Sequence, residues 1–111
     1  MTASEVTALV EQEIDGQWAE TNLHGVDLRA SLLPPIRTRF ISRSVHDGVV
    51  REALVDAWLV LEERPDTRDG YKIGYDDQTD EFGIASPGFA HDPHPCIVGW
   101  YGEFWTTFKG R

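Results

Sequence analysis

The densest group of side chains that could do chemistry lies between residues 91 and 96. His91, His94 and Cys96 follow a His-x-x-His-x-Cys spacing, and imidazole and thiolate are donors that zinc prefers. The same residues offer a Cys–His pair, the arrangement that activates a thiol for nucleophilic catalysis. Two prolines in this short span hinder three donors from surrounding one ion, and no fourth ligand is evident. The favoured interpretation is a surface loop, so these three residues remain candidate metal ligands and we expect no cofactor and no catalytic residue.

A second candidate is the acidic run at residues 76–81, whose carboxylates suggest a calcium-binding loop. The EF-hand pattern requires glycine at the position held here by Glu81 and a bidentate glutamate at the position held by Pro87. Aspartate is also common in tight turns, because its side chain accepts hydrogen bonds from the nearby backbone. The run therefore predicts a turn between two strands.

Charge is unevenly distributed along this acidic chain. The formal net charge is −9, yet residues 36–51 carry four arginines against one aspartate, a local balance of +3. The negative total argues against nucleic-acid binding, because the phosphate backbone would be repelled. It favours association with a basic protein, because opposite charge steers encounter.

Bulk properties place the chain among small soluble globular proteins. Its 111 residues predict one domain spanning 1–111. The best apolar run covers residues 53–61 and is interrupted by Asp56, so it is far shorter than the roughly 20 residues of a membrane span. The lone Cys96 suits a reducing compartment, and the first residues lack the pattern of a secretory signal. We therefore expect a cytoplasmic protein with no membrane partner.

The central structural question is whether residues 36–63 form a β-hairpin or a strand followed by a helix. Helical spacing is present, because apolar residues recur at Val50, Leu54, Ala57 and Leu61. The hairpin is favoured because one register, with Val45 opposite Val50, satisfies both faces of the sheet.

That register makes one face largely apolar, with pairs Ile36–Leu59, Thr38–Ala57, Phe40–Val55 and Ser42–Ala53. The other face then carries two ion pairs, one apolar pair and one cation–π pair, namely Arg43–Glu52, Arg39–Asp56, Ile41–Leu54 and Arg37–Trp58. Shifting the pairing by one residue would set Arg43 against Arg51.

A second hairpin is predicted from residues 71–75 and 81–86, with Tyr75 opposite Phe82. Gly74 then faces Gly83, which leaves a flat strip where an aromatic ring from the C-terminal helix can lie close to the backbone. Residues 96–100 are expected to form a short strand.

Two helices are expected at the ends of the chain. Thr2 and Glu5 match a capping box, which predicts a helix over residues 3–15. Residues 26–33 are expected to be extended or irregular. At the other end, Trp100, Phe104 and Phe108 recur at four-residue spacing, with Tyr101 and Trp105 as a parallel row, as on one helix face. The fold class is α+β: an N-terminal helix, an antiparallel meander sheet of four to five strands and a C-terminal aromatic helix.

The best functional lead is a mixed surface on the first hairpin. Trp58, Leu54 and Ile41 share a face with Arg37, so unless a helix covers them they form an apolar patch ringed by charge. Tyr101 and Trp105 are two further candidate binding residues.

Two function classes follow from the sequence. The first is a non-enzymatic domain that binds a basic protein partner, as an inhibitor or immunity-type protein does. The alternative is a small-molecule-binding protein or enzyme, with a pocket lined by the C-terminal aromatics and the 91–96 loop.

Overall fold

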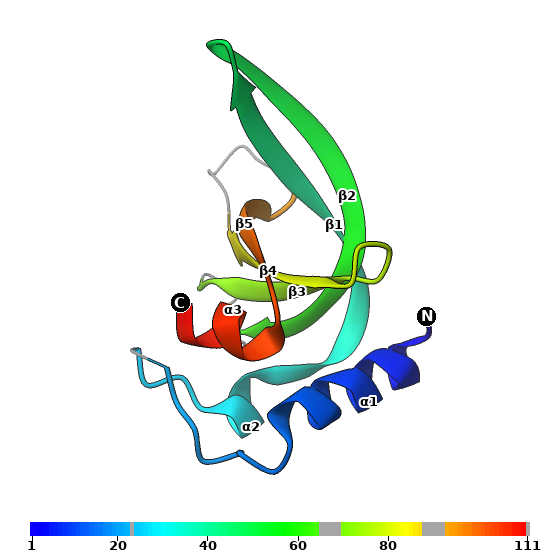
Figure 1. The fold of residues 1–111 in the computed structure, drawn as a ribbon, viewed down its shortest axis with the longest axis vertical. Coiled ribbons are helices and arrows are strands. Elements are labelled where there is room, and N and C mark those ends of the chain that lie inside the picture. Colours follow the sequence, from blue (N-terminus) through cyan, green and yellow to red (C-terminus); the bar gives the residue numbers. More distant parts are fainter. Residues whose placement is uncertain (23, 65–69, 88–92, 111) are drawn as a thin grey trace.

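The computed structural model describes residues 1–22, 24–64, 70–87 and 93–110. Its elements in chain order are α1 (Ala3–Ile14), α2 (Leu28–Ser31), β1 (Leu32–His46), β2 (Val49–Glu62), β3 (Lys72–Asp76), β4 (Glu81–Ser86), β5 (Cys96–Gly102) and α3 (Phe104–Gly110). This arrangement, shown in Figure 1, confirms the predicted α+β class.

The N-terminal helix begins where the capping box predicts. The Thr2 hydroxyl accepts from the N–H of Glu5, and the Glu5 carboxylate accepts from the N–H of Thr2, which satisfies two free backbone donors. The helix ends at Ile14, where Asp15 takes a left-handed conformation. The expectation of no helix over residues 26–33 was wrong, because Asp27 caps the N–H of Arg29 and starts the short α2.

The first hairpin confirms the predicted register and excludes the helical alternative for residues 50–61. Val45 lies opposite Val50, Arg39 opposite Asp56 and Arg37 opposite Trp58. The turn at Asp47 and Gly48 has positive φ at both residues, as a two-residue hairpin turn with the right twist requires.

The five described strands close into a barrel in the order β1-β2-β3-β4-β5. Consecutive strands pair antiparallel, including Tyr75 with Phe82 as predicted. The seam between β5 and β1 is parallel and joins Ile41 to Cys96 and Ser42 to Ile97. The sequence predicted the meander order, whereas this closure was not foreseen.

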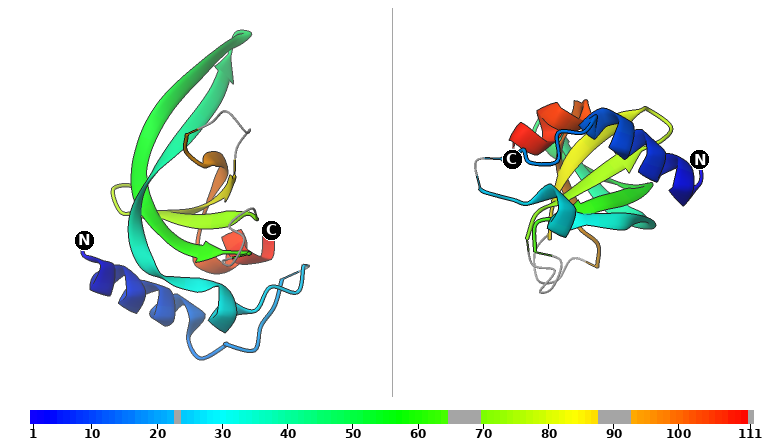
Figure 2. Two further views of the ribbon diagram at one scale, coloured as in Figure 1. Left: turned by 180° about the vertical axis from the view of Figure 1, so that it is seen from behind. Right: turned by 90° about the horizontal axis from the view of Figure 1, so that it is seen from below.

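Hydrophobic side chains form one cluster on each face of the sheet. The interior of the barrel holds Phe40, Ala57, Leu59, Ala85 and Ile97. The outer cluster packs the sheet against α1 and α3, with Val6, Val10, Ile14, Phe104 and Phe108 among its buried members. The two helices lie at the end of the barrel opposite the hairpin tip, as Figure 2 shows.

Gly74 and Gly83 lie opposite each other, as predicted, but the aromatic rings that cover them come from β1 and β5 and not from the C-terminal helix. A Cβ on Gly83 would stand 2.6 Å from the ring of Trp100, and one on Gly74 would stand 3.1 Å from the ring of Phe40. The predicted strand over residues 96–100 is confirmed, whereas the four-residue spacing that placed Trp100 and Tyr101 on the face of the C-terminal helix was misleading. Both belong to β5, and the chain turns into α3 only after Gly102, whose φ is +83°.

Candidate functional site

The hairpin of β1 and β2 projects from the barrel as a long curved arm (Figure 1). We use the name "the arm" for residues 39–56. Its outer face carries alternating rungs of apolar and charged pairs, which are Val45–Val50, Arg43–Glu52, Ile41–Leu54 and Arg39–Asp56. Cross-strand pairs of opposite charge fix the register of a sheet that has little core beneath it.

Both charged rungs are formed as the sequence predicts. Arg39 Nε lies 2.9 Å from Asp56 Oδ1, and Arg43 Nε lies 3.0 Å from Glu52 Oε1. The hydrogen bond from Arg39 lowers the pKa of Asp56, and the same bond raises the pKa of Arg39. These pairs are exposed, so they contribute little stability but do specify pairing.

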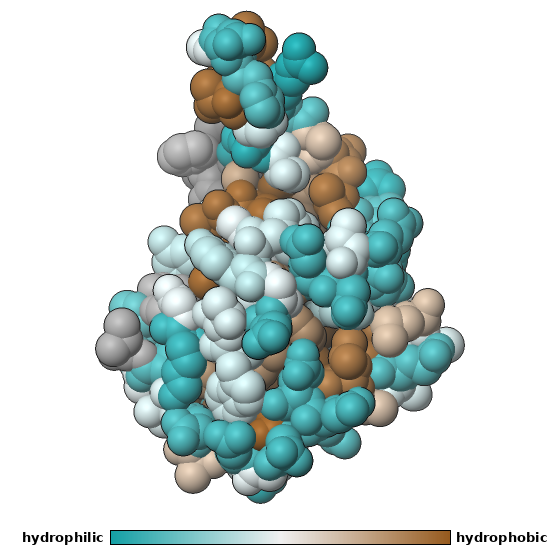
Figure 3. All heavy atoms as spheres, viewed as in Figure 1, coloured by the Kyte–Doolittle hydropathy of each residue, from teal (hydrophilic) through white to brown (hydrophobic). Residues whose placement is uncertain are grey.

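The apolar rungs of the arm differ in exposure. Val45, Val50 and Leu54 are exposed, the last at 59% of its surface, whereas Ile41 is buried at 4%. Figure 3 shows hydrophobic side chains at the tip of the arm and along it, interspersed with hydrophilic ones. Of the three apolar side chains expected to form an exposed patch, Leu54 is exposed, Trp58 is half-buried and Ile41 is buried.

At the base of the arm, Arg37 and Trp58 meet at a carboxylate from the β3–β4 turn. The Arg37 guanidinium lies 5.3 Å from the centre of the Trp58 ring. Asp77 accepts the Trp58 indole N–H at 3.1 Å and an Arg37 N–H at 3.2 Å, and the Met1 amine lies 3.6 Å away. The Trp58 bond, followed by the bond and charge of Arg37, lowers the pKa of Asp77 although partial desolvation opposes it.

The acidic run of residues 76–81 forms a turn, as predicted. Asp76 accepts the N–H of Gln78 at 2.9 Å, and Asp80 accepts the Tyr75 hydroxyl at 2.6 Å. Burial and this bond raise the pKa of Tyr75. Together with Asp77, three carboxylates of the run are therefore engaged by neighbouring groups.

The candidate metal residues are only partly within the described chain. His91 lies outside the described residues. Cys96 begins β5, and its sulfur accepts from Arg43 Nη1 at 3.5 Å. His94 precedes it by two positions, in a bend. Within the described ranges, no group of three or more His, Cys, Asp or Glu residues could hold a metal ion.

Tyr101 and Trp105 do not form one surface row. Tyr101 is exposed on β5, and its ring lies over Gly99. Trp105 lies on α3, where it packs edge-on against Phe104 and Phe108 and sits 5.8 Å from the Lys109 ammonium. Trp105 therefore belongs mainly to the outer cluster.

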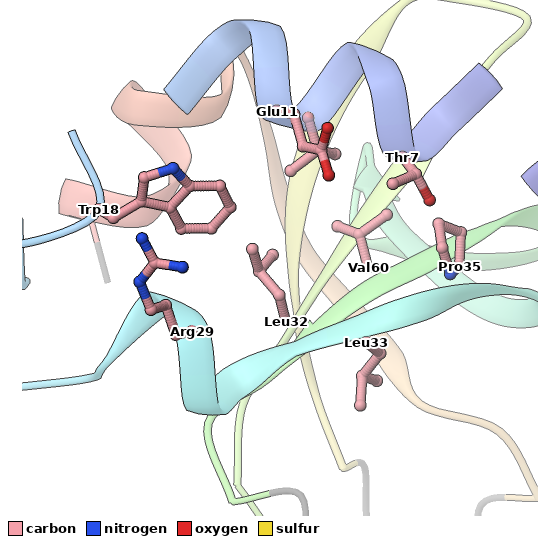
Figure 4. A pocket seen from close by; sticks show the side chains of 9 residues that line it. Thr7, Glu11, Trp18, Arg29, Leu32, Leu33, Pro35 and Val60 are labelled. Atoms are coloured by element: carbon pink, nitrogen blue, oxygen red, sulfur yellow. The ribbon is translucent and has the colours of Figure 1, made fainter. Parts of the chain in front are cut away.

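A groove between α1, α2 and the start of β1 was not foreseen from the sequence. It encloses about 250 Å³ and is lined by Thr7, Val10, Glu11, Trp18, Arg29, Leu32, Leu33, Pro35 and Val60. Figure 4 shows Arg29 beside the Trp18 ring on one side of the groove and Glu11 on α1 above Leu32. The Arg29 guanidinium lies 4.6 Å from the centre of the Trp18 ring. The sequence alone does not reveal this cation–π pair, because residues 18 and 29 are brought together only by the fold.

Comparison with known proteins does not assign this chain to a family. No family model matches the sequence, and neither curated proteins nor solved structures yield a match. Among the described helices, none is long and apolar enough to cross a membrane.

Proposed function

We propose that this protein acts by binding another protein, through the outer face of the arm. The observation that carries the proposal is the exposure of Val45, Val50 and Leu54 on one face of a projecting two-stranded sheet. Full burial of a Val or Leu side chain is worth roughly 1.5–3 kcal/mol. Three such side chains around the Arg43–Glu52 rung therefore provide an apolar centre with fixed charges beside it.

Net charge supports a basic partner. The chain as a whole carries −9, whereas residues 39–56 balance three arginines against three acids, and two of these acids, Glu52 and Asp56, are exposed on β2 among the apolar side chains of the arm. Complementary charge increases the association rate and excludes wrongly charged partners. An inhibitor or immunity-type role, in which a small acidic domain blocks a basic protein, fits this chemistry. Arg37 and Trp58 at the base of the arm, with Tyr101 on β5, extend the proposed contact area.

Affinity capture with matched variants tests this proposal. Wild type, a Val50→Asp/Leu54→Asp variant and an Ile36→Asp control are used as baits on native lysate. Ile36 is also an exposed apolar residue of β1, at 50%, but it lies outside the arm. A captured protein is then purified and titrated by calorimetry.

We expect wild type and the Ile36→Asp control to bind the purified protein alike. The arm variant should bind at least about tenfold more weakly, because it places two charges in the apolar centre. Equal binding by all three proteins would show that the arm is not the contact surface.

A second candidate function is binding of a small carboxylate with an apolar body in the α1–α2 groove. Neither Arg29 nor Glu11 forms an ion pair with another described residue, and apolar side chains lie between them. The groove, at about 250 Å³, is slightly smaller than the lower limit of the roughly 300–1,000 Å³ range of ligand pockets. Among the described residues, its lining includes neither the C-terminal aromatics nor residues 93–96.

Phenylacetate and aliphatic carboxylates provide a direct test of that candidate. Titration followed by amide chemical shifts should move signals of the groove, and Arg29→Gln should abolish the effect. The arm variant serves as the control, because it leaves the groove unchanged. Shifts that persist in Arg29→Gln would exclude this site.

A further inference from the structure

We propose that the partner adds an extended strand to the free edge of β2, and that this strand alternates basic and apolar residues. The inference rests on the proposed function, since it specifies how the arm would engage its protein partner. Among the described residues, only β1 pairs with β2 between Val49 and Ala57, because β3 joins from Trp58 onward. Nine residues of β2 therefore have one unpaired edge, and strand addition is a recurrent mode of protein recognition.

One hydrogen bond reveals the orientation of the β2 backbone. The N–H of Ile41 donates to the carbonyl of Pro95 at 2.8 Å, so it points away from β2. In an antiparallel ladder, two opposite residues either exchange both backbone hydrogen bonds with each other or point their N–H and C=O groups away from each other. Because Ile41 lies opposite Leu54, the N–H and C=O of Leu54 point to the free edge.

The alternation extends this orientation along the arm. Val50, Glu52 and Asp56 lie at even spacing from Leu54, so they too present backbone groups to the free edge. The same four residues have their side chains on the outer face. A strand added there would place its side chains directly beside them.

The side chains at this edge specify the chemistry of the added strand. Glu52 and Asp56 are 56% and 50% exposed, and each is held by an arginine of β1 on one side. A lysine or arginine on the added strand would approach the open side of each acid. Because Leu54 lies midway between them, the complementary segment has two basic residues four positions apart with an apolar residue between.

A second copy of this chain does not satisfy that pattern. Two-fold antiparallel pairing of β2 with itself keeps each side chain on its own face of the sheet. The only base on this part of β2 is Arg51, which lies on the face opposite Glu52 and Asp56. Every such register therefore sets these acids against an acid or an apolar residue. The acids disfavour self-pairing and favour a basic strand.

Synthetic peptides and the full chain test the inference directly. The probe is a labelled peptide of alternating threonine and valine, with two lysines four positions apart and valine midway. Its control carries glutamate in place of both lysines. By fluorescence anisotropy we expect the lysine peptide to bind at least about tenfold more tightly, with affinity falling as salt rises.

Two substitutions at one position separate strand pairing from side-chain contact. Leu54→Pro removes an N–H that faces the free edge, so the bonds to β1 are kept. Leu54→Thr removes the leucine but keeps that N–H. We expect Leu54→Thr to bind the lysine peptide up to about tenfold more weakly than wild type, because the apolar contact is lost, and Leu54→Pro to bind at least about tenfold more weakly than Leu54→Thr, because a backbone hydrogen bond is lost as well. Near-ultraviolet circular dichroism verifies that both variants are folded.

A charge exchange provides an independent check. Glu52→Lys/Asp56→Lys should transfer the preference from the lysine peptide to the glutamate peptide. Equal binding of both peptides by wild type would overturn the basic chemistry, and equal binding by folded Leu54→Pro and Leu54→Thr would overturn strand addition. If the Val50→Asp/Leu54→Asp variant still loses the captured protein in that case, the proposed function stands without the inference.

Discussion

Ile41 and Leu54 lie opposite each other in the first hairpin, yet Ile41 is 4% exposed and Leu54 is 59% exposed. The difference arises because β5 reaches the edge of β1 at this rung, where Ile41 bonds to Pro95 and pairs with Cys96. Leu54 has no such neighbour among the described residues. The arm is thus anchored on its β1 side and open on its β2 side.

The Arg39–Asp56 rung should show coupling in a double-mutant cycle. Arg39→Glu alone and Asp56→Arg alone should each destabilise the hairpin, because each sets like charges opposite. The double reversal should restore part of the loss, measured by urea unfolding at low salt. Reversal of Arg51 and Asp56 is the matched control, since these residues lie on opposite faces and should not couple. Absence of coupling at Arg39–Asp56 would contradict the pairing.

Asp77 should make stability depend on acidic pH. Its pKa in the folded protein is lowered, chiefly by the Trp58 hydrogen bond. Its contribution to the free energy of unfolding is therefore complete at pH values above the unfolded-state pKa of about 3.9. That contribution is lost as pH falls through the lower folded pKa. Asp77→Asn should unfold more easily at neutral pH by about 1–2 kcal/mol and lose less stability on acidification. Urea titrations at neutral and acidic pH measure both effects, and parallel pH profiles for the two proteins would refute the assignment.

Gly83 should tolerate no side chain. A Cβ there would stand 2.6 Å from the Trp100 ring and 2.9 Å from the Gly99 carbonyl oxygen. Gly83→Ala should therefore cost about 1–3 kcal/mol in thermal or urea unfolding, because the ring and the strand must move. Gly110→Ala is the control, since its Cβ meets nothing within 4 Å and alanine favours the helix. A neutral Gly83→Ala would mean that Trp100 does not lie on this glycine.

The buried pair of Lys72 and Glu62 should respond differently to single and double replacement. Their charged atoms lie 3.2 Å apart, and both side chains are less than one tenth exposed. Lys72→Met alone should cost about 3–5 kcal/mol, because a buried carboxylate loses the cation that lies 3.2 Å from it. Glu62→Leu/Lys72→Met should recover most of that loss in the same unfolding assay. A double variant as unstable as the single one would show that the cost lies in packing.

The register of the first hairpin was predictable because two faces constrain it together. Only one alignment sets Arg43 against Glu52 and Arg39 against Asp56 while keeping Phe40 on the apolar side. The burial of Ile41 was not predictable in this way. It depends on residues more than fifty positions later in the chain returning to β1.

The C-terminal segment shows how a spacing can mislead. Trp100 stands four residues before Phe104, as on a helix, but Gly102 with its positive φ separates strand from helix. The groove shows a different limit, because its lining comes from four separate stretches of chain between Thr7 and Val60. No local pattern marks such a site, since only the fold brings α1, α2 and β2 together.

The parallel seam between β1 and β5 rests on two residue pairs, Ile41–Cys96 and Ser42–Ile97. Closing it brings together the most distant strands of the sheet, so it carries the largest loop-closure entropy of any strand pairing here. We therefore expect the seam to form late in folding and to open before either hairpin separates. In amide hydrogen exchange, the Ile41 N–H should then exchange through an opening of lower free energy than the Phe40 N–H, which lies inside the first hairpin.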